Sequence, residues 1–534
     1  MAKPAQGSGE AIEGSLLDLL DDGTCLAILR GVPAECRPAL RLVCRRFQAL
    51  VDSALCPSFY LDDAAHLAGR RPRGAAIYAS RSDFLAAAAR VLQQRAGGLD
   101  TLLLDFDAYG CIAASHLLEQ QPLPRLRSIE LRNAEAQHVA ALRALRLPRL
   151  CRVALTRHIN GPVTAGPAAE LLVAQLAGLP LRRLRLGGYR MLPGVVASVA
   201  DALPHLSELT LEVERVEQHG RLELAALPRL ARLERFTLRL LNGPASAGSV
   251  TVAPLPATAS SLWQLSSLSL GHVRPGEGEE DAFWGSLAAL PLLQHLEYAE
   301  SSRAVWEPPE ALLRLGTLTS LCIKIEGSLD GDASPLSTWS QLPELPEGAL
   351  PALASLRVDS VGLLAFPASW CRLPLQELHI SGCASPRCWH YTLELPEELG
   401  ALAPTLRRLE LLSCGLRDLP DQLASLTGLT YLGLQHNRVA CLPALRRLQR
   451  LQAVDLWDNP VASAAQALQG CSALRRLVLG TAGLPRRRVA GGAAYEDEEA
   501  WRWEDAWLDS IRGQLPWVQA VGPPTADSTA EVHG

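Results

Sequence analysis

Aromatic residues are scarce in this sequence of 534 residues: they make up 5% of it, although 48% of the residues are hydrophobic. The apolar content is mostly Leu, Ala and Val, which suits small repeated layers better than one large core filled with rings. No stretch reaches the roughly 18 uninterrupted apolar residues that a transmembrane helix needs. Residues 1–14 have neither a basic start nor an apolar run, so we expect no signal peptide.

Neither sign of charge dominates, because 51 basic residues stand against 56 acidic ones and leave a net charge of −5. This balance excludes a general field for nucleic acid or an anionic membrane. The cysteines are odd in number (13) and scattered, and none of the five asparagines lies in an N-x-Ser/Thr sequon. These features favour a reducing compartment, so we expect the cytoplasm, the nucleus or both.

A repeat with the pattern L-x-x-L-x-L runs through most of the chain. The four most regular copies begin 23, 22 and 23 residues apart, at Leu406, Leu429, Leu451 and Leu474. Earlier copies, 22 to 35 residues apart, begin at Leu99, Leu126, Leu150, Leu181, Leu206, Leu233, Leu265, Leu293, Leu318, Leu353 and Leu375. The pattern therefore predicts fifteen strands, one in each repeat.

Each repeat has a simple physical basis. Alternate side chains of a strand share a face, so the fourth and sixth positions point into the core together. An Asn or Cys at the ninth position can bond backbone groups of the following turn that would otherwise be buried unpaired. One repeat cannot bury its own leucines, and stacked neighbours bury them for each other.

The pattern resembles the leucine-rich-repeat family over about three quarters of the chain. The resemblance implies an α/β fold, a solenoid with a curved parallel sheet on one side and helices or loops on the convex side. We expect the solenoid to span residues 99–485, with a linker, first strand and helix in 57–98. We expect Phe59 to Leu61 to form that strand and Ser82 to Arg95 to form that helix.

Three segments between strands have the composition of surface loops, namely 243–260, 274–281 and 330–348. After the last repeat, 486–523 resembles the cap that closes many such solenoids, and 524–534 is expected to be a disordered tail. Within the cap, Tyr495 to Ile511 has the spacing of an acidic helix, and Leu515, Val518 and Val521 have the spacing of a final half-strand.

Residues 14–56 differ in character from the repeats. Leu26 and Leu29 form an apolar surface with Leu19 and Leu20, and a break at 31–33 follows. A helical stripe comes next, made of Leu40, Val43, Cys44, Phe47 and Leu50 beside basic residues. Two or three helices in about forty residues bury too little surface to be stable alone, which suggests support from a partner.

This segment resembles the F-box. Asp21–Asp22 before Leu26, Ile28 and Leu29 is similar to its first helix, and residues 42–51 (LVCRRFQALV) to its L-V-C-R-x-W-x-x-L-[IV] core. Leu19–Leu20 replaces the family's Leu-Pro, and Phe47 its Trp. The alternative is an ordinary helical cap for the open end of the solenoid.

An F-box followed by leucine-rich repeats is typical of substrate receptors of cullin-based ubiquitin ligases. The resemblance implies that the F-box binds a Skp-type adaptor on a cullin scaffold while the repeats hold a target protein, so catalysis lies in other subunits. The adaptor contacts are then Leu19, Leu26, Ile28, Leu29, Leu40, Val43, Cys44, Phe47 and Leu50. The alternative function is a scaffold of the cytoskeleton or axoneme.

No catalytic or cofactor motif occurs: the sequence lacks a P-loop, G-x-G-x-x-G, G-x-S-x-G and H-E-x-x-H. His379, Cys383, Cys388 and His390 lie within a dozen residues, but their spacing matches no usual zinc finger and Cys383 falls on a ninth position. We therefore expect no metal, no cofactor and no enzymatic activity.

The outward positions of the last six strands are free of the core and are the expected contacts to a target protein. They are Arg357, Asp359, Glu377, His379, Arg408, Glu410, Tyr431, Gln435, His436, Asp455, Trp457, Asp458 and Arg476. Trp457 is the strongest candidate, because Trp, Tyr and Arg dominate interface hot spots. The alternative for Trp457 is packing over Tyr431 or under the cap.

Overall fold

The computed structural model describes residues 58–62, 99–105, 123–144, 147–157, 167–213, 221–240, 250–255, 262–300, 310–325, 342–360, 363–383, 392–461, 464–479, 511–518 and 520–522. The chain divides into two compact units, Met1–Tyr189 and Arg190–Gly534. We refer to them as unit 1 and unit 2 and describe each by itself.

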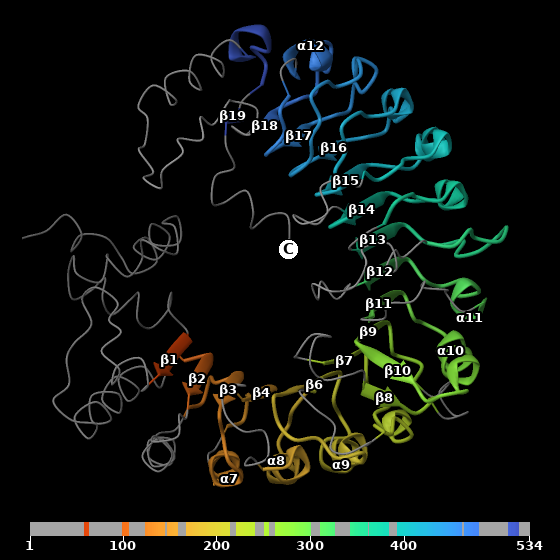
Figure 1. Cartoon of the computed structure of the whole chain (residues 1–534). Coiled ribbons are helices and arrows are strands. Elements are labelled where there is room, and N and C mark those ends of the chain that lie inside the picture. The colour runs from red at the N-terminus through yellow and green to blue at the C-terminus, as the bar shows by residue number, and fades with distance from the viewer. Residues whose placement is uncertain are drawn as a thin grey trace, which may run out of the picture. The chain divides into compact units, whose positions relative to one another are not determined.

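Unit 1 contains a parallel sheet whose strands follow the order of the sequence (Figure 1). Its strands are β1 Ser58–Asp62, β2 Thr101–Asp105, β3 Ser128–Arg132, β4 Arg152–Thr156 and β5 Arg183–Gly187. Two helices, α7 Ala136–Ala144 and α8 Ala169–Leu176, connect strands and pack on each other. Strand β1 confirms the strand predicted at Phe59 to Leu61.

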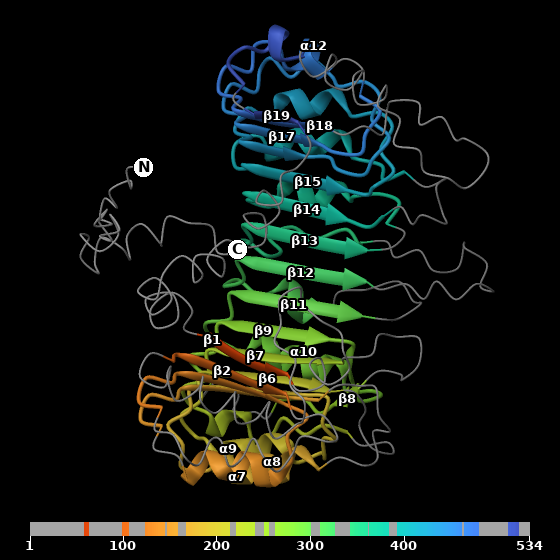
Figure 2. The ribbon, with the colours of Figure 1, turned by 90° about the vertical axis from the view of Figure 1, so that its left-hand side faces the viewer.

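Unit 2 contains a longer sheet of the same kind, seen as a row of parallel arrows in Figure 2. Its strands are β6 Glu208–Val213, β7 Arg235–Leu240, β9 Ser267–Gly271, β11 His295–Glu300, β12 Ser320–Ile325, β13 Ser355–Ser360, β14 Glu377–Ser381, β15 Arg408–Leu412, β16 Tyr431–Gly433, β17 Ala453–Leu456, β18 Arg476–Leu479 and β19 Ala520–Gly522. Each pairs in parallel with the next.

Short helices and turns connect consecutive strands and lie along one side of this sheet (Figure 1). They are α9 Val195–Ala202, η5 Leu227–Arg229, α10 Glu280–Ala288, α11 Glu310–Leu313, η8 Ala368–Arg372, η9 Glu397–Leu402, η10 Asp421–Ser425 and α12 Ala464–Leu468. No helix of the described part of the chain is long and apolar enough to cross a membrane.

All fifteen predicted strands are present, as β2 to β7, β9 and β11 to β18. Each begins two residues after the first leucine of its repeat, so the fourth and sixth positions lie within or directly beside the strand. In β15 these are Leu409 and Leu411, both fully buried. The leucines of adjacent repeats align by strand register, so each layer of the core continues the last.

The predicted polar ladder at the ninth position is also present. The Oδ1 atom of Asn437 accepts hydrogen bonds from the backbone N–H groups of Cys414 (2.9 Å) and Leu416 (3.1 Å) in the preceding repeat. Its Nδ2 atom donates to the carbonyl oxygens of Leu411 (2.6 Å) and Leu434 (2.8 Å). The ladder therefore satisfies backbone groups that the stacked repeats shield from water.

The eighth position carries a backbone signal that the sequence analysis missed. Seven of these positions have positive φ, between 52° and 76°: Asn133, Gly188, His272, Gly382, Ser413, His436 and Asp458. Gly, Asn, Asp and His are the residues that tolerate this left-handed conformation best. The turn after the strand therefore explains most of the residues found there.

Two of the expected loops contain regular structure. Val250–Val252 (β8) and Val273–Pro275 (β10) form a small parallel sheet of their own, and α10 begins at Glu280, so the loop prediction was wrong for 250–252, 274–275 and 280–281. The physical reason is burial of β-branched side chains, since Val252 and Val273 are 0% and 3% exposed.

Near the C-terminus, β19 pairs with β18 and confirms the predicted half-strand at Val521. The prediction was wrong at Leu515 and Val518, which lie in a turn, and Ile511 and Leu515 are buried. The F-box-like segment 14–56, the helix expected at Ser82 to Arg95, the cap residues 486–510 and the tail 524–534 lie outside the described residues.

Candidate functional site

The third, fifth and seventh positions of the repeats form one continuous surface of unit 2, which we call the strand face. Parallel register brings equivalent positions side by side, so Arg357, His379 and Glu410 lie on adjacent strands β13, β14 and β15. These outward residues were predicted to share this register. The structure adds how their side chains interact.

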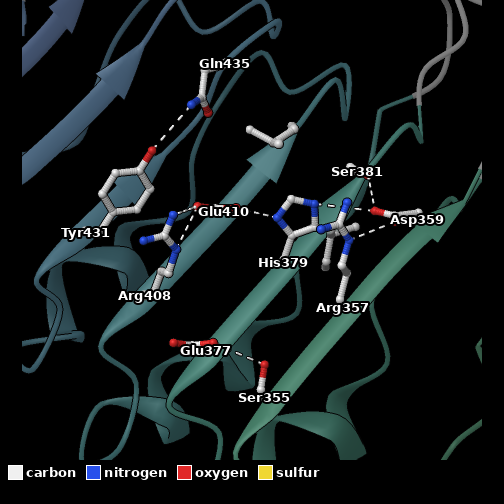
Figure 3. Close-up of polar contacts among 12 residues, drawn as sticks. Ser355, Arg357, Asp359, Glu377, His379, Ser381, Arg408, Glu410, Tyr431 and Gln435 are labelled. Carbon is white, nitrogen blue, oxygen red and sulfur yellow. Dashed lines mark hydrogen bonds and ion pairs between the residues drawn. The ribbon is translucent and has the colours of Figure 1, made fainter. Parts of the chain in front are cut away.

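A network of five charged residues joins three strands at the middle of this surface (Figure 3). The Nε atom of Arg357 donates to Oδ2 of Asp359 at 2.8 Å, and Nε of Arg408 donates to Oε1 of Glu410 at 2.8 Å. The ring of His379 lies between the two carboxylates. Its Nδ1 atom bonds Oε2 of Glu410, and its Nε2 atom lies 3.4 Å from Oδ1 of Asp359.

The electrostatics of this network follow from its geometry. Burial alone would lower the pKa of His379, but its two carboxylate partners raise it above the ordinary value. Burial likewise opposes ionisation of Asp359 and Glu410, yet hydrogen bonds and the nearby cations hold both carboxyl pKa values below their usual range. Among the described residues Nε2 lies 3.4 Å from Asp359 without a hydrogen bond, while Nδ1 bonds Glu410. The protonated ring is therefore favoured by the negative charge on each side of it.

Tyr431 lies flat on the strand face rather than projecting from it. Its side chain is buried, and the guanidinium carbon of Arg408 lies 4.2 Å from its ring centroid. Gly433 makes room for the ring, because a Cβ atom there would lie 3.0 Å from Cε1 of Tyr431 and 3.3 Å from Cγ of Glu410. Gln435 donates from Nε2 to the Tyr431 hydroxyl at 3.4 Å.

Beside the network, the strand face is hollowed by about 230 Å³. The hollow is lined by residues of β12 to β15, namely Ser320, Cys322, Ser355, Leu356, Arg357, Glu377, Leu378, His379, Arg408 and Glu410. Burial raises the pKa of the Cys322 thiol to about 11, so this cysteine stays protonated and unreactive at neutral pH. Ser355 donates to Oε2 of Glu377 at 3.2 Å.

A second charged cluster on β9, β11 and β12 was missed by the sequence analysis, which considered only the last six strands. Lys324 pairs with Glu297, and Ser269 donates to Oε2 of Glu297 at 3.1 Å. These residues occupy the fifth and seventh positions, so extending the same positional rule to earlier repeats would have found them.

The other predicted contacts lie toward β17 and β18. Trp457 is half-buried, and its backbone N–H donates to Oδ1 of Asp455 at 3.0 Å. Burial raises the pKa of Asp455. Arg476 is half-buried on β18.

His436 and Asp458 differ from the other predicted contacts, because both occupy the left-handed eighth position. Nδ1 of His436 lies 3.0 Å from Oδ2 of Asp458. Their identities are explained by the turn, so a binding role is not needed to account for them.

The residues considered for a metal do not converge where the structure describes them. His379 points to the strand face, whereas Cys383 points into the core, where its sulfur lies 3.8 Å from that of Cys414. Cys388 and His390 lie outside the described residues. Within the described part of the chain, no three His, Cys, Asp or Glu side chains are grouped to hold a metal ion.

Comparison with known proteins gives structural matches only. No protein-family profile and no curated protein sequence matches the chain. An internalin from Listeria monocytogenes is 17% identical over 58% of this chain and 76% of its own, with a TM-score of 0.35. A leucine-rich-repeat protein of Leptospira interrogans is 18% identical over 75% and 98%, with a TM-score of 0.39.

A structure of the Toll–Spatzle complex of Drosophila is 17% identical over 73% of this chain and 48% of the matched one, with a TM-score of 0.44. These matches are distant and concern the fold alone. The strand register, the buried leucines at fixed positions and the ninth-position ladder of this chain are themselves the features of a leucine-rich-repeat solenoid fold.

Proposed function

We propose that this protein holds another protein on the strand face of unit 2 and performs no chemistry of its own. The observation that carries the proposal is the network of Arg357, Asp359, His379, Glu410 and Arg408. These positions point away from the core, so the solenoid does not require charged residues there. Side chains already fixed by their neighbours lose little freedom on binding, which favours affinity.

The charge pattern supports a protein as the partner. Acidic and basic groups alternate across the strands, as in Glu212 with Arg239 and Glu297 with Lys324. A polyanion would need an excess of cations, whereas a protein surface can offer charges of both signs. Trp457 adds a half-buried ring of the type that dominates interface hot spots.

Affinity capture with the full chain tests this proposal. We expect Trp457→Ala to weaken recovery of the partner by about 2 kcal/mol or more of binding free energy without lowering the melting temperature. Trp263→Ala is the matched control, because Trp263 is 54% exposed and precedes β9 rather than lying on the strand face. If both variants weaken partner binding equally, or if neither variant weakens it, the proposal is contradicted.

We further propose, on the resemblance of residues 14–56 to the F-box, that the protein is the substrate receptor of a cullin-based ubiquitin ligase. Its strand face would then hold the protein to be modified, and residues 14–56 would bind a Skp-type adaptor. The cytoskeletal or axonemal scaffold is the competing function. We place the protein in the cytoplasm, the nucleus or both in the first case and on the cytoskeleton in the second.

Copurification separates these two functions. Recovery of a Skp-type adaptor and a cullin, lost with Val43→Ala and Phe47→Ala together, supports the ligase receptor. Gln48→Ala is the control, since residue 48 is adjacent to Phe47 but off the apolar stripe. Recovery of tubulin or axonemal proteins without any adaptor would support the scaffold instead.

A further inference from the structure

Two arginines that line the hollow keep hydrogen-bond donors unused within the described part of the chain. Arg357 bonds Asp359 through Nε, which leaves both of its terminal nitrogens without an acceptor. Arg408 bonds Glu410 through Nε and Nη2, which leaves Nη1. Their side chains are 43% and 33% exposed, so these donors are accessible.

The acceptors of the same hollow are largely occupied. Glu410 is only 5% exposed, and its two oxygens accept from Arg408 and His379. Glu377 retains one free oxygen, because the other accepts from Ser355. The residues that line the hollow therefore have more free hydrogen-bond donors than free acceptors for a side chain of a bound protein.

The network also ties each arginine to a carboxylate. Asp359 bonds Arg357 through Nε, Glu410 bonds Arg408 through Nε and Nη2, and His379 lies between the two carboxylates on β14. When His379 is protonated, the five network residues comprise three cations and two carboxylates and have a net charge of +1. The carboxylate of Glu377, which also lines the hollow, brings the net charge to zero. A partner carboxylate can accept from a guanidinium through charge-assisted bonds, which are stronger than neutral ones.

We propose that this hollow receives the carboxylate of an Asp or Glu side chain of the bound protein, held by Arg357 and Arg408. The inference rests on the proposed function, since it names the chemistry of the partner at one point of the strand face. Asp359, His379 and Glu410 act as positioning residues that keep the two arginines in place. Glu377 opposes the incoming carboxylate and limits its affinity.

A randomised peptide library displayed on phage, panned against the immobilised full chain, tests the subsite. We expect the wild-type chain to enrich peptides that share an Asp or Glu at one position. Synthetic copies should bind at least tenfold more weakly to a chain with Arg357→Gln and Arg408→Gln, and more tightly to one with Glu377→Gln. Arg235→Gln is the matched control, because Arg235 holds the same repeat position as Arg408 on β7, away from the hollow.

The outcomes are distinct. Peptides enriched without an acidic position, or bound equally by the double arginine variant, would overturn the subsite and leave the binding face in place. Enrichment of Lys or Arg with weaker binding to Glu377→Gln would show that the hollow takes a cation instead. Failure to enrich any sequence above an empty support would count against both the subsite and the binding face. Because displayed peptides carry no phosphate, success identifies a carboxylate as sufficient.

Discussion

His379 and Glu410 lie on adjacent strands, and the Nδ1 atom of the imidazole bonds the carboxylate of Glu410 while the opposite ring nitrogen faces Asp359. Three strands of one sheet are thus joined across their outward positions by side chains as well as by their backbone. This arrangement makes the stability of the strand face depend on protonation, since a protonated ring is attracted by the carboxylate on each side.

The pH dependence has a definite sign. Because the pKa of His379 is raised by folding, the stabilisation it provides is fully present below its unfolded pKa of about 6.5 and is lost as pH rises through the folded pKa. We expect the difference in unfolding free energy between wild type and His379→Gln to shrink from pH 6 to pH 9. Denaturant unfolding at several pH values measures it, with His295→Gln, an exposed histidine on β11 of the same unit, as the control. A difference that grows with pH would show that folding does not stabilise the protonated form of His379.

At acidic pH the two carboxylates of the network have the opposite effect, because they make the protein less stable as pH falls. Folding lowers the pKa of Asp359 and Glu410, so the stability they contribute is present above their unfolded values near pH 4 and is lost as pH falls through the folded ones. We expect a chain with Asp359→Asn and Glu410→Gln to lose less stability on acidification than wild type. Identical acid unfolding profiles would show that these carboxylates are not paired in solution.

Replacing the ladder residue Asn437 should lower the free energy of unfolding. Asn437→Ala leaves the backbone N–H groups of Cys414 and Leu416 without their acceptor in a buried layer. We expect a loss of about 2 kcal/mol or more in unfolding free energy. Gln452→Ala, which removes an exposed side chain directly before β17, should change it by less than about 0.5 kcal/mol. Similar effects of the two substitutions would contradict the role of the ladder.

Gly433 should tolerate a side chain poorly. A Cβ atom there meets Tyr431, Glu410 and Gln435 at 3.0 to 3.3 Å, so Gly433→Ala requires these side chains to shift and we expect about 1–3 kcal/mol of destabilisation. Gly316→Ala is the matched control, because a Cβ atom there has no neighbour within 4 Å. If Gly433→Ala is as stable as wild type, Tyr431 does not lie flat across this position.

Much of the fold could be predicted because its signal is local. The spacing of leucines such as Leu406 and Leu429 fixed where each strand begins, and Asn437 and Asn459 marked the turns. Residues 250–252 and 273–275 misled the prediction, since their flanks are rich in Gly, Ser and Pro while their pairing with each other depends on long-range packing.

The site could be predicted as a set of positions but not as a structure. Parallel register made it foreseeable that Arg357, His379 and Glu410 share one surface. That His379 bridges two carboxylates, or that Tyr431 is buried over Gly433, depends on side-chain directions that a repeat pattern does not encode. Trp457 makes the same point, because its place at an outward position was predictable but its half-buried state was not.

The location of the bound protein tests the central claim most directly. A photo-crosslinking amino acid can replace Leu412, at the seventh position on β15, or Asp421, an exposed residue of η10 on the other side of the sheet. We predict that position 412 crosslinks to the captured partner and position 421 does not, with both chains equally stable. Crosslinking from position 421 but not from position 412 would contradict a binding role for the strand face.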